Sequence, residues 1–329
     1  MLTKYFLIGL SSYFAGIVFI FLLKKVFLKS RRLIHREIPL IGGLSMWLSF
    51  VLVCLAGASW LYRGLSQKTM GIIFTSGIML FFGIVDDWRE LSIRTKFLVQ
   101  IIATSFLIFF GIRTHIIYIG NLLNIIITFV WIIGITNAFN HLDIIDGLAA
   151  GSAVIVSLSL FIISLLNHDI ATAILALALS GAILSLLIYN LPPARVYMGN
   201  AGSHFLGFIL AAIALVISYA PLERKMALLS PLLILGLPIF DTAFLIVMRI
   251  MKKSLPFKKS NDHLALRLLA LGYSKKKALW VMLALSLFFS LCGILVSQVS
   301  NHFSALIVSF VVLVSLILTN KMRKVVTYA

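Results

Sequence analysis

Acidic residues are scarce in this 329-residue chain, and most of them stand beside apolar segments. The chain has ten Asp and Glu residues against 28 Lys and Arg residues. Asp86 and Asp87 are adjacent, and two carboxylates about 4 Å apart repel by about 4 kcal/mol at an effective dielectric of about 20. A divalent cation reverses that repulsion, and Mg²⁺ is typically held by one or two carboxylates together with substrate phosphates. The pair therefore predicts a metal and phosphate site, with a solvated helix end as the alternative.

A second cluster lies in the segment TNAFNHLDIIDGLAAG, residues 136–151. Asn140, Asp143 and Asp146 are spaced by three, so they would share one face if the segment is helical. Gly147 then predicts a bend before the next helix. Three aligned polar groups exceed what a plain helix–helix turn needs, which favours a binding role.

A third cluster follows a Pro-Pro turn in residues 189–208. Gly199 and Asn200 begin a run of small residues at a predicted helix start. Such helix N-termini expose N–H groups and the positive end of the helix dipole, which suit phosphate. A plain N-cap at Ser203 is the structural alternative.

Asp241 stands alone inside an apolar run, and a short polar helix follows it. A lone intramembrane Asp costs roughly 2.5–3.5 kcal/mol, so it indicates function unless it is held in a buried ion pair. Pro238 is expected to kink this helix. His263 and Arg267 are spaced i,i+4 and would share a helix face, from which they can bind phosphate or a sugar acetamide. An amphipathic interfacial helix is the alternative.

The elements that must position these residues are membrane-spanning helices. Hydrophobic residues make up 61% of the chain and the mean hydropathy is +1.11, which is typical of a polytopic helical membrane protein. We therefore predict an all-α integral membrane protein of about eleven transmembrane helices, forming one catalytic domain over residues 1–329. The apolar runs are residues 5–23, 40–61, 69–85, 96–112, 122–139, 147–166, 170–189, 203–220, 226–248, 278–298 and 302–319.

The distribution of Lys and Arg predicts the orientation. Alternate connections carry 22 basic residues on one side and six on the other, so the richer side is expected to be cytoplasmic. The N-terminus is then outside and the C-terminus cytoplasmic. All five polar clusters fall on the cytoplasmic side, although only Lys and Arg entered the count. The loops predicted to form the site there are residues 24–39, 86–96, 140–147, 190–203 and 249–277.

The net charge of +18 does not predict a nucleic-acid partner, because the basic residues lie in short loops between apolar runs.

The ordered set of motifs resembles the polyprenyl-phosphate N-acetylhexosamine-1-phosphate transferases. The resemblance extends from about residue 36 to residue 277 and includes IPLIGG, the Asp-Asp pair with Lys96, NAFNxxDxxDGLA, the PPARVYMGxAGS run, isolated Asp241 and the final DHxxxR. The helix number is similar to the branch that makes undecaprenyl-pyrophosphoryl-N-acetylglucosamine. Membership implies transfer of a sugar 1-phosphate from a UDP-N-acetylhexosamine to undecaprenyl phosphate, with release of UMP, to start a cell-envelope glycan.

The resemblance also implies a cofactor and roles for individual residues. The cofactor is Mg²⁺, with Mn²⁺ as a substitute, held by Asp241, Asp87 and Asn140. Asp86, Asp87, Asp241 and His263 are the expected catalytic residues. The substrate-binding residues are expected to be Lys96, Asn140, Asp143, Asp146, Asn200 and Arg267. The expected partners are the nucleotide sugar, undecaprenyl phosphate, the bilayer of a bacterial cytoplasmic (inner) membrane and, in a homodimer, a second copy.

The chain departs from the family pattern at three places. Ile144 follows Asp143 where the family has Gly, and Asn200 replaces an Asp. Ala265 and Leu266 stand where the phospho-N-acetylmuramoyl-pentapeptide transferases are rich in His. An acidic role therefore does not transfer to position 200, although an amide can still bind metal or phosphate.

Two other classes of membrane protein compete with this interpretation. A prenyltransferase of the aromatic-acceptor type would share an Asp-rich segment such as NHLDIID, but it requires a second DxxxD loop that the chain lacks. A transporter would show internal repeats and midplane charges, and only Asp241 is clearly intramembrane.

Overall fold

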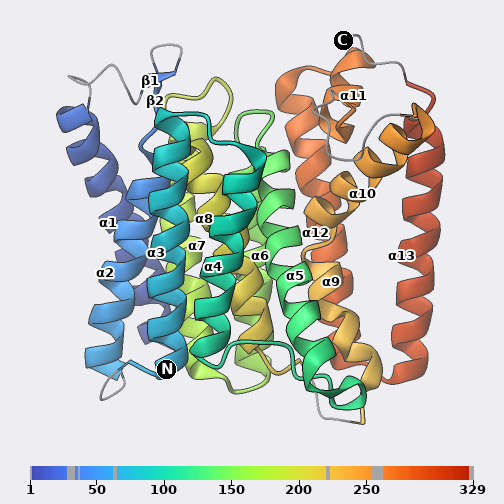
Figure 1. Ribbon diagram of the computed structural model, residues 1–329, viewed down its shortest axis with the longest axis horizontal. Coiled ribbons are helices and arrows are strands. Elements are labelled where there is room, and N and C mark those ends of the chain that lie inside the picture. Colours follow the sequence, from blue (N-terminus) through green and yellow to red (C-terminus); the bar gives the residue numbers. More distant parts are fainter. Residues whose placement is uncertain are drawn as a thin grey trace.

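The computed structural model describes residues 2–27, 34–35, 38–61, 65–219, 223–253 and 262–325. They fold into a bundle of long, roughly parallel helices (Figure 1). A two-residue antiparallel strand pair, β1 (Ile34–His35) and β2 (Ile38–Pro39), lies at one end. The helices are α1 (Leu2–Phe27), α2 (Gly42–Leu61), α3 (Gln67–Trp88), α4 (Ile93–Phe109), η2 (Ile117–Ile119), α5 (Gly120–Leu142), α6 (Leu148–Leu166), α7 (Ile170–Asn190), α8 (Gly199–Val216), η3 (Lys225–Leu229), α9 (Ser230–Ile234), α10 (Gly236–Met251), α11 (Leu264–Ala270), α12 (Lys275–Gln298) and α13 (Asn301–Met322).

The chain is a multi-pass helical membrane protein, as predicted. Within the described residues, eight helices are long and apolar enough to cross a membrane, or nine if one bent pair forms a single span. Every predicted apolar run overlaps helical residues, but α4 and the apolar part of α2 are shorter than these spans. The number of eleven crossings therefore stays a prediction.

The apolar run at 226–248 is broken rather than continuous. Residues 225–234 and 236–251 meet at a bend of 76°. Pro238 has no N–H to donate to the Ile234 carbonyl four residues earlier. That carbonyl instead accepts a hydrogen bond from the Ser290 hydroxyl at 3.1 Å. The expected kink is present, and its centre lies at Leu235, one turn before the proline.

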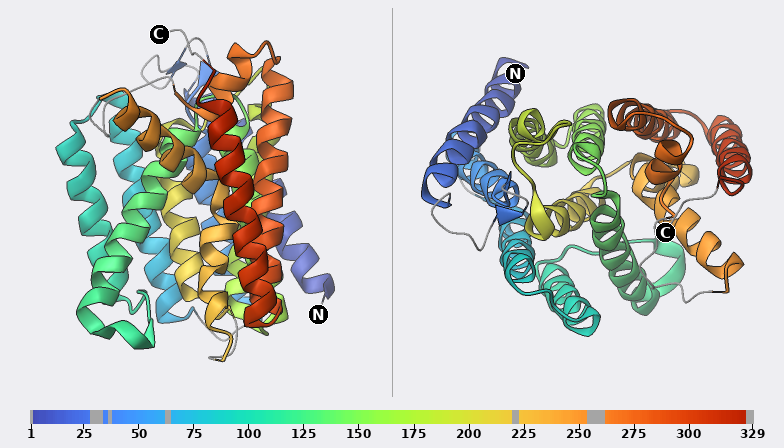
Figure 2. Two further views of the ribbon diagram at one scale, coloured as in Figure 1. Left: turned by 90° about the vertical axis from the view of Figure 1, so that its right-hand side faces the viewer. Right: turned by 90° about the horizontal axis from the view of Figure 1, so that it is seen from above.

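Helix α8 is the most enclosed span of the bundle. Seen from above, it lies among the other helices (Figure 2). Of its apolar window 78% is buried, against 11% for α13 at the edge. Helices α2, α3 and α5 all pack on α8, so its first turn meets the ends of three other helices.

The bundle has two distinct ends. Helix α1 begins at one end and α13 finishes at the other, where β1, β2 and α11 also lie (Figure 1). This arrangement is the one required if the chain termini face opposite sides of a membrane. Which end is cytoplasmic stays a prediction from the basic residues. The end that carries α11 also holds the acidic clusters, and we call it the acidic end.

Candidate active site

Asp87 caps the first turn of α8. One carboxylate oxygen accepts a hydrogen bond from the Asn200 N–H at 2.8 Å, and the other accepts from the Ala201 N–H at 3.1 Å. The first N–H groups of a helix have no partner inside it, and a carboxylate there also meets the positive end of the helix dipole. The N–H groups that the sequence suggested for phosphate are therefore used by Asp87.

Small residues make this cap geometrically feasible. Gly83 lies one turn before Asp87 on α3, and a Cβ at Gly83 would come within 2.4 Å of the Ala201 Cα. The bare backbone of α3 thus packs directly on the start of α8. Gly199 has a φ of +69°, and a Cβ there would stand 2.5 Å from the Asp87 Oδ2 atom. Both positions exclude a side chain, so the cap depends on glycine.

Substitution of Gly199 by Ala is expected to reduce catalytic turnover at least tenfold, because the new methyl group pushes the Asp87 carboxylate away from α8. The positive φ alone costs a non-glycine residue about 1–2 kcal/mol. Gly272→Ala is the matched control, because Gly272 has a φ of +86° and a Cβ added there would meet no atom within 4 Å. Initial rates and thermal unfolding of both variants separate the two effects. Equal losses of activity in both variants would refute a specific role for the Asp87 contact.

The start of α2 also supports this loop. The Gly42 and Gly43 N–H groups donate to the carbonyls of Tyr197 and Met198 at 3.0 and 3.1 Å. The Tyr197 N–H in turn donates to the Pro39 carbonyl at 3.1 Å. The IPLIGG segment is therefore a backbone support for the turn into α8. The sequence identified this segment only through the resemblance.

Asp86 has a different role from its neighbour. It is buried, and it accepts hydrogen bonds from the Leu91 N–H at 2.8 Å and the Lys96 ammonium at 2.5 Å. Successive residues of an α-helix are rotated by about 100°, because a turn takes about 3.6 residues. Asp86 therefore joins α3 to α4 while Asp87 faces α8. Lys96 was predicted to bind substrate, and in the structure it forms an ion pair with Asp86.

Asn200, where the family has Asp, pairs with Asn140. The Asn140 amide nitrogen donates to the Asn200 side-chain oxygen at 3.2 Å and to the Ser203 hydroxyl at 2.9 Å. These bonds leave the Asn140 side-chain oxygen as an acceptor for another group. The structure thus brings two of the predicted site residues together at the start of α8.

The expectation that Asn140, Asp143 and Asp146 share one helix face is wrong. Helix α5 ends at Leu142, so Asp143 is its C-cap and Asp146 lies in the turn before α6. The predicted bend at Gly147 is confirmed by its φ of +79°. The Asp146 carboxylate accepts from the Ala194 N–H at 3.1 Å, which ties this turn to the Pro-Pro loop. The helix propensities of the residues in this segment did not show that α5 would end at Leu142.

Asp143 at the acidic end carries a carboxylate that is only partly exposed. No hydrogen bond or ion pair to it occurs within the described ranges. Burial, together with the negative charges of Asp87 and Asp146, raises the pKa of the Asp143 carboxyl to about 7. A cation bound beside Asp143 would therefore favour the charged form of its carboxyl and would itself be stabilised by it.

Asp241 holds the start of α11. It is buried, and its two oxygens meet the His263 Nδ1 atom at 2.8 Å and the Leu264 N–H at 2.9 Å. The His141 ring lies 6.3 Å from the His263 ring, centre to centre. His141 on α5 therefore links this pair to the turn that contains Asp143. The sequence patterns did not single out His141, and its place beside Asn140 was the only signal.

Arg267, which was predicted to bind substrate, is 1% exposed. Its guanidinium donates to Asp262 at 2.6 Å and to the Met322 carbonyl at 2.8 Å. The side chain thus faces protein groups at the end of the bundle.

The oxygen donors at the acidic end are of the chemical kind that Mg²⁺ prefers in proteins. Within the described parts of the chain, no three His, Cys, Asp or Glu residues form a complete metal cage. Mg²⁺ does not require one, because it is usually bound by one or two carboxylates plus phosphate oxygens and water. Asp143 has no other partner among the described residues, Asn140 has an uncommitted oxygen, and each carboxylate oxygen of Asp87 and Asp241 keeps a second lone pair.

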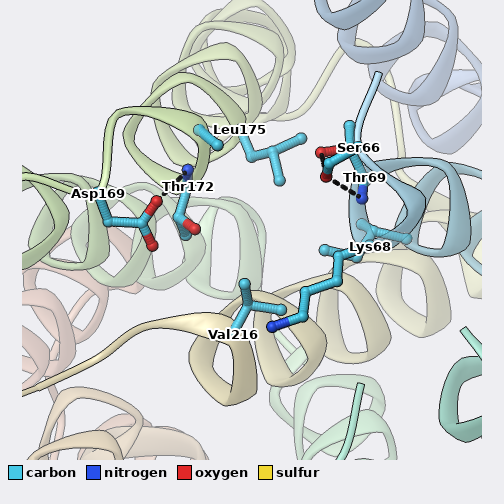
Figure 3. A pocket seen from close by; sticks show the side chains of 9 residues that line it. Ser66, Lys68, Thr69, Asp169, Thr172, Leu175 and Val216 are labelled. Atoms are coloured by element: carbon cyan, nitrogen blue, oxygen red, sulfur yellow. Dashed lines mark hydrogen bonds between the residues drawn. The ribbon is translucent and has the colours of Figure 1, made fainter. Parts of the chain in front are cut away.

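A small hollow lies at the opposite end of the bundle, between the starts of α3 and α7 and the end of α8 (Figure 3). Its polar groups are caps: Ser66 accepts from the Thr69 N–H, and Asp169 accepts from the Thr172 N–H, each at 3.1 Å. Lys68 is exposed at its edge. Ser66 and Asp169 therefore serve as the N-cap residues of α3 and α7.

Fold and site together define a multi-pass helical membrane protein with an oxygen-rich site at one end of its bundle. Comparison with known proteins shows that transferases are similar to this chain. A profile of glycosyl transferase family 4 matches residues 69–218. The chain belongs to this family, and the expected resemblance is thereby confirmed.

Three relatives illustrate the similarity. A probable undecaprenyl-phosphate N-acetylglucosaminyl 1-phosphate transferase of Bacillus subtilis is 30% identical over 293 residues, covering 86% of this chain and 80% of the relative. A decaprenyl-phosphate N-acetylglucosaminephosphotransferase of Mycobacterium leprae is 31% identical, with 74% and 70% covered. An undecaprenyl-phosphate alpha-N-acetylglucosaminyl 1-phosphate transferase of Thermotoga maritima is 27% identical, with 87% of each chain covered.

Proposed function

We propose that this chain transfers N-acetylhexosamine 1-phosphate, most simply N-acetylglucosamine 1-phosphate, from a UDP-sugar to undecaprenyl phosphate and releases UMP. The observation that carries the proposal is that the Asp143 carboxylate has no described hydrogen-bond or ion-pair partner, while Asp87, which caps α8, lies near enough to raise its pKa. The names of the relatives support the reaction class. The product would start a cell-envelope glycan at the cytoplasmic face of the bacterial inner membrane.

The chemistry is a phosphoryl transfer. An oxygen of the lipid phosphate forms a bond to the β-phosphorus of the UDP-sugar, and the bond from that phosphorus to the bridging oxygen breaks, so UMP leaves with the electron pair. A phosphate monoester has a second pKa of about 6 and is largely dianionic at pH 7. A general base therefore has little to contribute. Positioning and charge neutralisation dominate such reactions.

A bound magnesium ion would neutralise negative charge on the pyrophosphate oxygens. Asp87, Asn140 and Asp241 are proposed as the residues that would hold it, and Asp143 would add negative charge near Asp87. The cap on α8 holds the Asp87 carboxylate in a fixed direction. The direction of this one proposed ligand is thus fixed by backbone N–H groups.

His263 is proposed to act on the phosphate that leaves. Its Nδ1–H donates to the Asp241 carboxylate, which assigns the tautomer and leaves Nε2 as the second ring nitrogen. When this nitrogen is protonated, it can donate a hydrogen bond to a phosphate oxygen.

The direct test incubates the purified protein in lipid nanodiscs with undecaprenyl phosphate, Mg²⁺ and a panel of UDP-amino sugars. Release of UMP with at least one sugar, together with formation of the lipid-linked sugar pyrophosphate, is expected. A requirement for the lipid phosphate distinguishes transfer from hydrolysis. If no UDP-amino sugar yields UMP, the proposed function is wrong.

Asp143→Asn is expected to stabilise the metal-free protein by a few degrees at pH 8 and by a smaller amount at pH 5. The pKa of Asp143 is about 7 in the folded protein and near 3.8 when unfolded. The folded state therefore binds the extra proton between these values, and stability falls as pH rises through the window. Thermal unfolding in EDTA at both pH values measures the effect. Equal shifts at pH 5 and pH 8 would contradict the raised pKa.

A further inference from the structure

Arg267 is the largest fully buried side chain among the described residues, and its contacts are with protein groups. Nε donates to the Asp262 carbonyl at 3.2 Å, and one terminal nitrogen donates to the Asp262 carboxylate at 2.6 Å. The other terminal nitrogen donates to the carbonyls of Met322, at 2.8 Å, and Val325. The guanidinium carbon also stands 5.1 Å from the centre of the Phe244 ring. All three guanidinium nitrogens are therefore used inside the protein.

Two of the carbonyls that Arg267 binds, those of Met322 and Val325, belong to the last turn of α13 and the residues that follow it. The final carbonyls of a helix have no partner inside it and carry the negative end of the helix dipole. A buried guanidinium satisfies two carbonyls here and places a positive charge at that end. Arg267 thus acts as a C-terminal cap that is supplied by a different helix.

The same short segment carries His263. Asp262, His263 and Leu264 precede Arg267 by at most one and a half turns, and Asp241 holds His263 and the Leu264 N–H from α10. Phe244 lies one turn after Asp241 on α10. The segment is therefore held on one side by α10 and on the other by the end of α13.

Asp262 completes the anchor. It is buried and also accepts from the exposed Lys252 at 2.7 and 3.0 Å. Burial acts to raise the pKa of the Asp262 carboxyl, but hydrogen bonds and charge from Lys252 and Arg267 hold it below its ordinary value. The Asp262–Arg267 pair is thus charged and compensated within the protein.

We propose that Arg267 is a positioning residue that fixes His263 by clamping its segment to the C-terminal end of α13, in place of the substrate contact suggested by its motif. Because Arg267 would act through His263, this role rests on the proposed function. It predicts that the residues at the end of α13 affect turnover although they carry no catalytic group. The clamp consists of Arg267, Asp262 and the carbonyls of Met322 and Val325.

The test compares two truncations of the full chain in nanodiscs. Ending the chain after Arg323 removes the Val325 carbonyl. Ending it after Val325 keeps that acceptor and is the matched control. Loss of one buried hydrogen bond to a charged group is expected to lower kcat about tenfold in the shorter chain. The control should stay within about twofold of the full chain, and KM for the UDP-sugar should change by less than about twofold in both.

A double-mutant cycle with Arg267→Lys distinguishes the clamp from a substrate contact. Lysine keeps the charge but cannot reach four acceptors at once. We expect Arg267→Lys to lower kcat by a larger factor than it changes KM. Combining it with the shorter truncation should lower kcat little further, because both changes remove the same interaction. A rise in KM with Arg267→Lys, with independent losses from the truncation, would overturn the proposal. Lys252→Gln, which removes only the exposed partner of Asp262, should have kcat within about twofold.

Amide hydrogen exchange tests the clamp without any activity. The shorter truncation should lower protection of residues 264–270, and the control truncation should not. Unchanged protection would overturn the clamp. If the full chain releases no UMP but exchange responds as expected, the proposed function fails while the clamp stands.

Discussion

Asp87→Asn is expected to lower kcat for sugar-phosphate transfer by about 10²–10³-fold, the range seen when a preorganised electrostatic group is removed. A carboxamide has one acceptor oxygen, so the N–H of either Asn200 or Ala201 loses its partner. The variant also removes a negative charge from the proposed metal site and from the positive end of α8. UMP release at saturating substrates, measured from pH 7 to pH 9, gives the effect.

The pH series separates an electrostatic role of Asp87 from general-base catalysis. The lipid phosphate is already ionised above pH 7. If the role is electrostatic, raising the pH restores little activity to Asp87→Asn. Full recovery at pH 9 would indicate that Asp87 acts as a base.

Asp169→Asn is the matched control for Asp87→Asn. Asp169 is also an Asp that caps a helix, accepting from the Thr172 N–H at 3.1 Å (Figure 3), but it lies at the opposite end of the bundle. Asn is an equally good N-cap residue. We expect rates within about twofold of the parent and little loss of stability. A large loss in this control would show that capping alone explains the Asp87 effect.

Asp241→Asn is expected to have the second largest effect, lowering kcat by about 10²–10⁴-fold. An Asn in place of an Asp that orients a catalytic His cost about 10⁴ in a serine protease, where the wrong tautomer was selected. Here the amide would lose one of the two contacts to His263 Nδ1 and the Leu264 N–H. It would also remove a proposed Mg²⁺ ligand, so the concentration of Mg²⁺ for half-maximal rate should rise.

His263→Gln separates the two roles of Asp241. It should lower kcat without changing the Mg²⁺ requirement. His302→Gln, at an exposed His on α13, is the control and should stay near the parent rate. Asp241 acts only through His263 if two results are found. The variants Asp241→Asn and His263→Gln must have the same Mg²⁺ concentration for half-maximal rate, and the double variant must have a kcat no lower than that of either single variant.

The helices could be predicted from the sequence because their cause is local. A run of about 20 apolar residues must satisfy its backbone groups internally in a bilayer, and a helix is the simplest way to do so. The same physics gathers most of the polar clusters at helix ends and in the connections, and the order of the clusters predicted the family. The break before α10 was foreseen as a kink at Pro238, but its centre at Leu235 depends on the Ser290 hydroxyl, which comes from α12.

The roles of individual site residues were less predictable. Asp86 and Asp87 are adjacent and chemically identical, yet one pairs with Lys96 and the other caps α8. Arg267 matched a binding motif, yet its nitrogens meet groups from the end of α13, 55 residues or more away along the chain. Spacing within a segment cannot reveal partners that arrive from distant segments.

The sequence by itself therefore determined the helical membrane fold, the gathering of acids at one end and the family, because each follows from hydrophobicity, loop charge and motif order along the chain. Only the tertiary structure decided which carboxylates are already satisfied. It gave Asp86, Asp87, Asp146 and Asp241 partners inside the protein and left Asp143 without one in the described part of the chain. The physical reason is that a carboxylate's charge is compensated by whichever N–H or cation packs against it, and helix packing sets that choice.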